Sequence, residues 1–158
     1  MSDIIFWRHA EAHDAIENQS DLDRKLTVKG QRNAERVAHW LDRNLPSQCR
    51  VYMSEAKRSQ QTARTLPRKT KLLAAINPDA SATDVLEAVG WKDGRGADEL
   101  VVVVGHQPWM GECISQLLGI QTAEPLSIKK SAAWWLQQRT REERVETIVR
   151  AVITPEFL

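Results

Sequence analysis

The 158-residue chain has few cysteines, almost no net charge and no long apolar run. The two cysteines, Cys49 and Cys113, lie far apart and fit neither a disulfide framework nor a metal-binding motif. A formal net charge of +1 provides no broad field to attract nucleic acid or an anionic membrane surface. No run of about 18 apolar residues is available to cross a bilayer. The sequence starts without a basic segment ahead of an apolar one, which argues against a signal peptide. We therefore expect a reduced, cytoplasmic protein with no metal, no nucleic-acid partner and no membrane partner.

The composition is otherwise that of an ordinary globular protein. Apolar residues make up 42% of the chain and charged residues 27%. This length suits one domain with a hydrophobic core. No internal repeat, low-complexity tract or linker divides the sequence, so we expect residues 1–158 to form a single domain.

Short apolar runs alternate with amphipathic segments through most of the chain. Strands are predicted at 3–7, 50–53, 71–76 and 100–104. Helices are predicted at about 27–45, 55–66, 81–89 and 108–119, with N-caps at Thr27, Ser54 and either Ser81 or Thr83. Residues 10–25 read as a loop, and two strands at 131–138 and 147–153 flank a charged turn at 139–146. The pattern predicts an α/β protein: a three-layer sandwich whose mostly parallel central sheet has an antiparallel C-terminal strand and helices on both faces.

Basic side chains follow three of the predicted strands. Arg8 and His9 come directly after the first, Arg58 begins the helix after the second, and His106 follows the valine-rich strand. In open parallel sheets, ligands bind beyond the carboxyl ends of the strands. Arginine can hold two phosphate oxygens at once. Each residue alone is weak evidence, but their convergence at one sheet edge predicts a site for a phosphoryl dianion.

Four segments of this sequence resemble the histidine phosphatase superfamily, also called the phosphoglycerate mutase-like fold. They are RHAEA at 8–12, DLDRKLTVKG at 21–30, MSEAKRSQQTA at 53–63 and GHQP at 105–108. The short segment between Ile76 and Leu100 leaves little room for the large lid found in bigger members, and the chain looks like the small SixA-type phosphohistidine phosphatases. A flavodoxin-like domain with a chance set of basic residues is the alternative fold.

The resemblance implies a metal-independent phosphatase that works through a covalent phosphohistidine. His9 is then the nucleophile, and Arg8, Arg58 and a protonated His106 bind the phosphoryl oxygens. The implied partner is a phosphorylated protein, such as a phosphotransfer domain, or a small phosphorylated substrate. A small-molecule phosphomonoester phosphatase and a non-catalytic phosphate-binding module remain as alternatives.

The leaving group helps to choose among these functions. An alkoxide needs a general acid, whereas imidazole leaves easily because its conjugate acid has a pKa of about 6.5. Glu11 and Asp79 are weak candidates for such an acid, and Asp79 reads more naturally as a turn residue. The lack of a clear acid favours phosphohistidine as the substrate. Trp134 and Trp135 have no predicted function; packing is the simpler reading, and a partner surface is the alternative.

Overall fold

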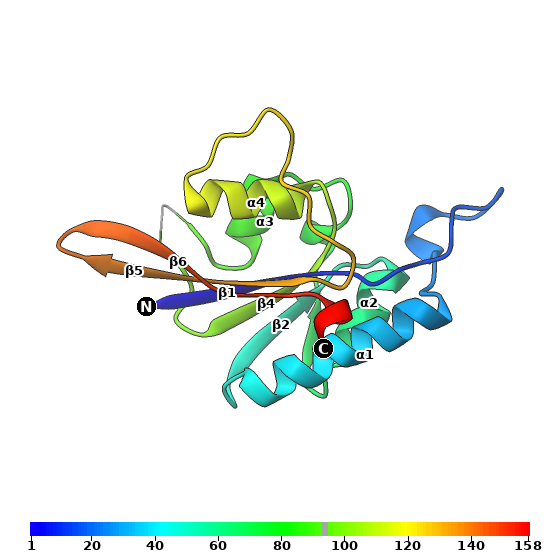
Figure 1. Cartoon of the computed structure of the whole chain (residues 1–158). Coiled ribbons are helices and arrows are strands. Elements are labelled where there is room, and N and C mark those ends of the chain that lie inside the picture. The colour runs from blue at the N-terminus through cyan, green and yellow to red at the C-terminus, as the bar shows by residue number, and fades with distance from the viewer. Residues whose placement is uncertain (93–94) are drawn as a thin grey trace.

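The computed structural model describes residues 1–92 and 95–158, and its centre is a six-stranded sheet with helices on both faces (Figure 1). The strands are β1 (Ser2–Arg8), β2 (Cys49–Met53), β3 (Thr70–Leu72), β4 (Leu100–Gly105), β5 (Ala133–Arg141) and β6 (Arg144–Ile153). The α-helices are α1 (Val28–Asn44), α2 (Lys57–Ala63), α3 (Ala82–Ala88) and α4 (Trp109–Leu118). Single 3-10 turns lie at Asp21–Asp23, Ala74–Ile76 and Pro155–Phe157.

The sheet has the strand order β3-β2-β4-β1-β5-β6. The first four strands run parallel, with Ile4 opposite Val101 in the central β1–β4 pair. Strand β5 runs antiparallel to β1 and pairs with β6 in a hairpin. The predicted α/β sandwich, with its mostly parallel sheet and antiparallel C-terminal strand, is therefore confirmed.

Strand β1 is buried because both of its faces pack against helices. Ile4 and Phe6 point into a core shared with α3 and α4, whereas Ile5 and Trp7 point into a second core shared with α1. Burial of each such side chain contributes about 1.5–3 kcal/mol. The two cores hold β1 and β4 side by side, so that Arg8 lies opposite Gly105 at the carboxyl edge of the sheet.

The third strand is shorter than predicted. Only Thr70–Leu72 pairs with β2, and the segment predicted as strand up to residue 76 turns into a 3-10 helix at Ala74–Ile76. Strand β3 is an edge strand whose single neighbour ends at Met53. The Leu73 amide makes the last of these hydrogen bonds, to Met53 O at 2.8 Å, and beyond it there is no further strand to pair with.

The C-terminal hairpin is longer than predicted, because the expected charged turn at 139–146 is mostly strand. The turn itself consists of Glu142 and Glu143, both with positive φ, which is the geometry of a tight type I′ turn. Arg139 and Glu146 lie opposite each other and form an ion pair at 2.9 Å. The sequence pattern assigned these two charged residues to the turn. In the structure they lie in the paired strands, where the cross-strand ion pair brings their opposite charges together.

The paired tryptophans pack on opposite faces of the sheet. Trp134 packs against the core that contains Phe6, and Trp135 belongs to the core that contains Trp7. The Trp135 indole also donates to Asp3 Oδ2 at 2.7 Å. Packing therefore accounts for both rings. In the described part of the chain, no helix is both long and apolar enough to cross a membrane.

Candidate active site

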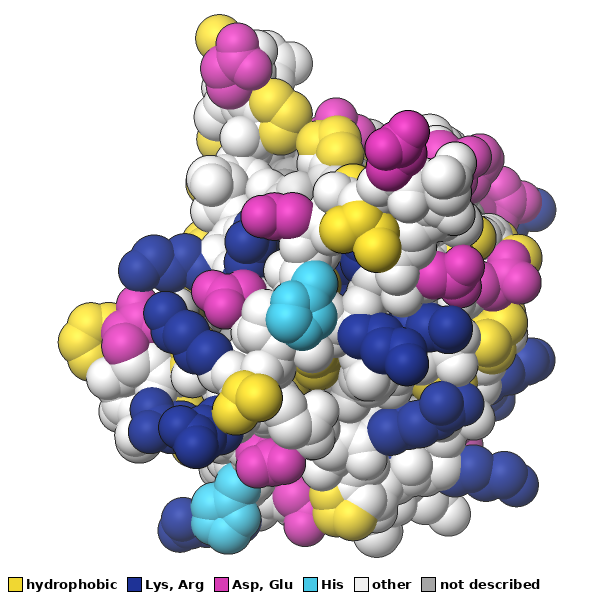
Figure 2. Space-filling model, turned by 90° about the vertical axis from the view of Figure 1, so that its right-hand side faces the viewer, with side chains coloured by type: hydrophobic (Ala, Val, Ile, Leu, Met, Phe, Trp, Pro, Cys, Tyr) yellow, Lys and Arg dark blue, Asp and Glu magenta, His cyan; other side chains and the backbone are white. Residues whose placement is uncertain are grey.

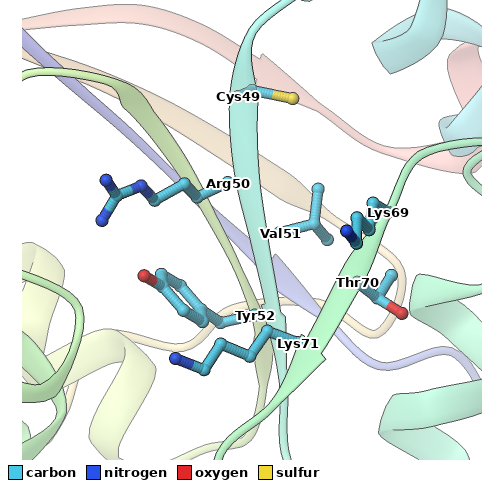
Figure 3. A pocket seen from close by; sticks show the side chains of 7 residues that line it. All are labelled: Cys49, Arg50, Val51, Tyr52, Lys69, Thr70 and Lys71. Atoms are coloured by element: carbon cyan, nitrogen blue, oxygen red, sulfur yellow. The ribbon is translucent and has the colours of Figure 1, made fainter.

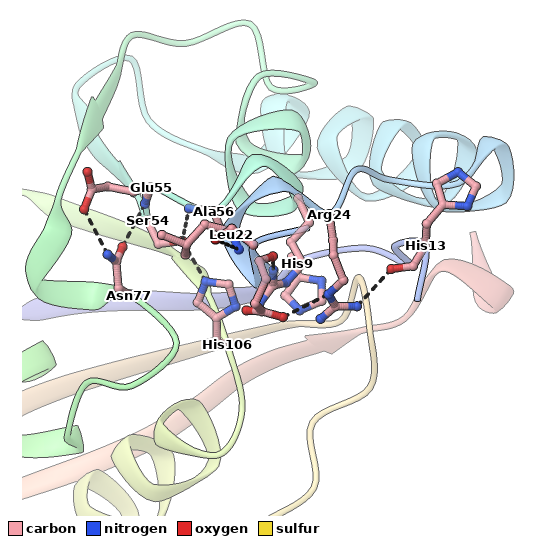
Figure 4. A network of polar contacts seen from close by, with 12 residues as sticks. His9, His13, Leu22, Arg24, Ser54, Glu55, Ala56, Asn77 and His106 are labelled. Carbon is pink, nitrogen blue, oxygen red and sulfur yellow. Dashed lines mark hydrogen bonds and ion pairs between the residues drawn. The ribbon is translucent and has the colours of Figure 1, made fainter. Parts of the chain in front are cut away.

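The four predicted residues meet at the carboxyl edge of the parallel strands. Arg8 ends β1 and His9 follows it, Arg58 lies in the first turn of α2, and His106 follows β4. His9, Arg58 and His106 are almost completely buried, with 6%, 3% and 2% of their surface exposed. The two imidazole centroids lie 5.2 Å apart (Figure 4). The arrangement concentrates two imidazoles and two guanidinium groups in one small region.

The imidazole of His9 is held in one tautomer. Its Nδ1 lies 2.8 Å from the Ala10 carbonyl oxygen, which can only accept, so Nδ1 carries the proton and Nε2 has a free lone pair. Thr62 Oγ1 in turn accepts the Ala10 amide at 3.0 Å and fixes this piece of backbone. Burial, assisted by nearby Arg58 and Arg8 and opposed by the Ala10 bond, lowers the pKa of His9 to about 3. His9 is therefore a neutral imidazole with a fixed orientation.

The second imidazole, His106, is oriented by Ser54. The Ser54 hydroxyl lies 2.6 Å from His106 Nε2 and also accepts the Ala56 amide at 3.3 Å. Because His106 Nε2 is the one acceptor that the Ser54 hydroxyl proton has among the described residues, the hydroxyl is best directed at Nε2, which places the imidazole proton on Nδ1. Nδ1 is buried and has no partner among residues 1–92 and 95–158. A neutral His106 can thus donate a hydrogen bond through Nδ1.

The expectation of a protonated His106 is wrong, because the ring is deeply buried. Burial, together with His9, Arg58 and Arg8, lowers the pKa of His106 to about 2. The sequence showed the positive neighbours but not the extent of the burial. The tautomer set by Ser54 still provides a donor, although the ring carries no charge.

The role predicted for Ser54 is also different. Helix α2 begins at Lys57 with Ala56 at its N-cap, and no side chain caps it. It ends at Ala63, earlier than the predicted residue 66. The Ser54 hydroxyl is directed to His106 instead. Ser59, one residue after Arg58, donates to Val104 O at 2.8 Å and so joins α2 to the end of β4.

Gly105 allows α4 to approach the end of β4. A Cβ at this position would lie 2.2 Å from the Trp109 indole, so no larger residue fits. Gln107 supports the same turn, because its Oε1 accepts the Gly111 amide at 2.6 Å and its Nε2 donates to Leu126 O at 2.7 Å. The GHQP segment thus places His106 through close packing and side-chain capping.

Both arginines keep donor groups that no described residue satisfies. Arg8 donates from Nη1 to Ile128 O at 2.6 Å, and burial followed by the charge of Arg58 lowers its pKa. Burial also lowers the pKa of Arg58, although it stays protonated at neutral pH. The Nε atoms of both side chains are buried without a partner in the described residues. Together with His106 Nδ1, they are three buried donors suited to an oxyanion.

Two residues of the 10–25 loop, Asp21 and Arg24, join the site. The sequence placed both in the family-like segment at 21–30 but assigned neither a role. Asp21 Oδ2 accepts from Arg58 Nη2 at 2.9 Å, and Asp21 Oδ1 accepts from Arg24 Nε at 2.9 Å. Partial burial raises the pKa of Asp21, but the hydrogen bonds from Arg58 and Arg24 lower it more, so it lies below its usual value. The i,i+3 spacing within DLDRKL indicates the Asp21–Arg24 pair, but nothing in the sequence indicates the contact with Arg58.

Glu11 and Asp79 were the two candidates for a general acid. In the described residues, neither side chain forms a hydrogen bond or ion pair with the two site arginines or the two site histidines. Glu11 Oε1 accepts from the Thr27 hydroxyl at 2.9 Å and so joins the loop to the start of α1. Asp79 is exposed in the turn after Ile76. The carboxylate that does contact a site arginine, Asp21, is kept ionised by two guanidinium groups.

A separate cavity of about 390 Å³ lies over β2 and β3 (Figure 3). Its lining residues include Arg50, Tyr52 and Lys71, and none of the four predicted site residues. It therefore has no part in the arrangement around His9.

Comparison with known proteins defines the class. Residues 4–80 match the histidine phosphatase superfamily (branch 1). This range contains Arg8, His9 and Arg58 in the segments that resemble the family. The chain belongs to the histidine phosphatase superfamily, and its class of enzyme is a phosphatase.

Within that class, the chain is similar to SixA proteins. It is 29% identical over 129 residues to the phosphohistidine phosphatase SixA homolog of Haemophilus influenzae, covering 73% of this chain and 77% of that protein. It is 30% identical over 138 residues to a protein of Picosynechococcus, covering 82% and 81% of the two chains. The solved structure of the protein histidine phosphatase SixA complexed with tungstate superposes with a TM-score of 0.74 at 24% identity, covering 98% of each chain.

Proposed function

We propose that residues 1–158 act as one histidine phosphatase domain without a large lid, and that it hydrolyses phosphohistidine on a cytoplasmic phosphotransfer protein. The observation that carries this proposal is the hydrogen bond from His9 Nδ1 to Ala10 O at 2.8 Å. It leaves a neutral Nε2 lone pair beside three buried oxyanion donors. A nucleophile and its binding groups are thus oriented before substrate arrives.

The first step transfers the phosphoryl group to His9. The His9 Nε2 lone pair forms a bond to phosphorus while the P–N bond of the substrate breaks. The other ring nitrogen of the substrate histidine carries a proton, so the electron pair of the broken bond leaves on a neutral imidazole. Arg8, Arg58 and the Nδ1 donor of His106 stabilise the charge on the three equatorial oxygens. Water then attacks phosphorus, the bond to His9 breaks, and inorganic phosphate and free His9 are produced.

The choice of phosphohistidine rests on the carboxylates. An alkoxide leaving group needs a proton in the transition state, and imidazole needs it far less. Glu11 is held by Thr27, Asp79 is exposed in a turn, and Asp21 is ionised between Arg58 and Arg24. Glu11 and Asp79 thus form no hydrogen bond or ion pair with the four site residues in the described chain, and the Asp21 carboxylate is engaged by two guanidinium groups. The similarity to SixA proteins supports the same substrate class.

The test compares a phosphohistidine peptide, a phosphoserine peptide and a chromogenic phenyl phosphate. We expect kcat/KM for phosphohistidine to exceed that for phosphoserine by about a hundredfold or more, the size of effect that a missing general acid produces. Faster turnover of phosphoserine would overturn the assignment in favour of a phosphomonoester phosphatase.

The nucleophile is tested separately by rapid quench. Acid-labile, alkali-stable phosphate is expected on the wild-type protein and not on His9→Ala. The control is His39→Ala, an exposed histidine on α1. Unchanged turnover in His9→Ala, with no covalent phosphate on the wild type, would reject His9 as the nucleophile. Tungstate binding without any turnover would indicate a non-catalytic binding module.

A further inference from the structure

A basic groove starts at Arg8 and runs away from the histidine pair. Its volume is about 540 Å³, and it lies between the first half of α1, the segment before β5 and the C-terminal 3-10 turn. Five cationic and two acidic residues line it: Arg8, Lys29, Arg36, Lys129 and Lys130, with Glu11 and Glu156. We call this feature the basic groove. Because Arg8 lines both the groove and the candidate phosphate site, the two are continuous.

Helix α1 places its polar side chains along this groove by simple helical spacing. Lys29, Asn33 and Arg36 lie at positions i, i+4 and i+7, on one face of the helix. The apolar stripe of the same helix, including Ala34, Val37 and Leu41, faces the core instead. The groove wall is therefore a regular feature of α1.

The acidic side chains of the groove are already engaged. Glu156 pairs with Lys129 at 2.8 Å, and Glu11 accepts the Thr27 hydroxyl at 2.9 Å. Lys29, Arg36 and Lys130 form no ion pair with the described residues, and all three are exposed. Three cations thus face solvent beside the phosphate site. Figure 2 shows one face of the molecule, on which Lys and Arg side chains gather across the middle and lower part of the surface.

The dimensions of the groove suit a short extended peptide. The helix rises about 1.5 Å per residue, so the span from Lys29 to Arg36 is on the order of 10 Å. An extended chain covers that distance in about three residues. A segment that continues from a phosphorylated side chain seated against Arg8 is therefore long enough, with about three residues, to span Lys29 and Arg36, and Lys130 lines the same groove.

We propose that the basic groove binds an acidic segment of the substrate protein, close in sequence or in space to its phosphohistidine. This inference rests on the proposed function and adds the charge that the partner must carry. Opposite charge on the partner raises the association rate and holds the phosphorylated side chain at the site. A protein with a net charge of only +1 obtains this attraction locally, on the face that carries the site.

The experiment uses two phosphohistidine peptides that differ only in three neighbouring residues, which are Glu in one and Ser in the other. The groove variant is Lys29→Gln, Arg36→Gln, Lys130→Gln. The control variant, Arg43→Gln, Lys69→Gln, Lys71→Gln, removes the same charge from exposed positions that do not line the groove. For wild type and control we expect KM for the acidic peptide to be about tenfold lower than for the neutral one, as electrostatic attraction of this kind allows. That preference is lost in the groove variant and, for wild type, in high salt.

The outcomes separate the two proposals. Equal turnover of both peptides by the wild type, or an equal loss in the control variant, overturns the basic groove as a docking site while leaving phosphohistidine as substrate. Turnover of neither peptide overturns the proposed function and the groove with it. Tripolyphosphate, a small polyanion, is tested as an inhibitor of the same reaction. If the groove variant loses inhibition by tripolyphosphate but keeps the wild-type KM for the acidic peptide, the groove binds a small polyanion and the proposed protein partner is overturned.

Discussion

The carboxylate of Asp21 lies 2.9 Å from Nη2 of Arg58, and the Asp21 carbonyl oxygen accepts from Nη1 of the same guanidinium at 2.7 Å. Two oxygen atoms of Asp21, a loop residue, therefore hold the Arg58 guanidinium in place, while its buried Nε has no partner in the described chain. Asp21 fixes the orientation of the arginine and also places a negative charge beside a site proposed to bind anions. The two effects oppose each other and can be separated by a change of charge alone.

Asp21→Asn should bind tungstate more tightly than the wild type. The amide oxygen still accepts from Arg58, so the orientation is kept while the negative charge is lost. Because the Asp21 side chain is half exposed, we expect a modest fall in the inhibition constant of about threefold. Asp23→Asn, in the same loop, is the matched control. Weaker tungstate binding would show that orientation of Arg58 matters more than the charge.

Ser54→Ala should impair catalysis through the tautomer of His106. Loss of the 2.6 Å contact with Nε2 frees the proton to occupy either nitrogen, so Nδ1 no longer always donates. We expect kcat to fall about tenfold, less than for the complete loss of an oxyanion donor, because Nδ1 still carries the proton part of the time. Nitrogen chemical shifts of His106 measured by NMR should show mixed tautomers, and Ser54→Thr should restore one. A single unchanged tautomer in Ser54→Ala would contradict this role.

Stability should fall as the pH drops below about 6.5. In the folded state the pKa values of His9 and His106 are lowered to about 3 and about 2, whereas unfolded histidine titrates near 6.5. Below that pH the unfolded chain binds more protons, and each histidine reduces the free energy of unfolding by up to about 1.4 kcal/mol per pH unit. Urea unfolding of His106→Gln between pH 7 and pH 4 should give a slope shallower by about 1 kcal/mol per unit. His39→Gln is the control and should keep the wild-type slope. If His106→Gln also keeps the wild-type slope, the buried histidine does not cause the loss of stability at low pH.

Gly30→Ala should destabilise the start of α1. A Cβ at position 30 would lie 2.0 Å from the Glu11 carbonyl oxygen, and backbone cannot give way as a side-chain tip can. We expect a loss of about 2 kcal/mol or more in the free energy of unfolding, as for an overpacked core site. Gln31→Ala, one residue further along the helix and exposed, should be nearly neutral. Equal stabilities for the two variants in urea would rule out this close approach.

The hairpin turn should accept a stabilising change. Glu142 and Glu143 both have positive φ, a region that Asn and Gly adopt at lower cost. Glu142→Asn with Glu143→Gly should raise the free energy of unfolding by about 0.5–1 kcal/mol. Glu142→Gln with Glu143→Gln removes the same charges without easing the backbone. A gain of the same size in that control would assign the effect to charge.

The predictable parts of this fold are those with strong local patterns. Thr27 caps α1 by accepting the Gly30 amide at 2.9 Å, and Gly119 ends α4 with positive φ, as predicted from the sequence. Strand β4 was clear because five apolar residues in a row require burial on both faces. These signals are carried by neighbouring residues. The arrangement of Arg8, His9, Arg58 and His106 followed once the strand ends were known.

What the sequence did not show depends on contacts between distant segments. Ser54 looked like a helix cap because caps are recognised by local spacing, but its hydroxyl contacts a residue 52 positions away. The contact between Asp21 and Arg58 spans 37 positions and has no local pattern. The end of β3 was set by the length of its neighbour β2, not by its own residues. The low pKa of His106 likewise requires knowledge of everything that buries it.

The position of His9 has a consequence for how such proteins diversify. Its amide donates to Gly105 O at 3.0 Å and its carbonyl oxygen accepts the Ser131 amide at 3.2 Å, so two neighbouring segments hold it from both sides. Asp21 and Lys29, in contrast, belong to the loop and helix surface at the rim. Mutations at the rim can therefore change which molecules are admitted without moving the reacting atom. Because the residues that select the substrate are separate from the reacting atom, related proteins can acquire new substrates and keep the same reaction.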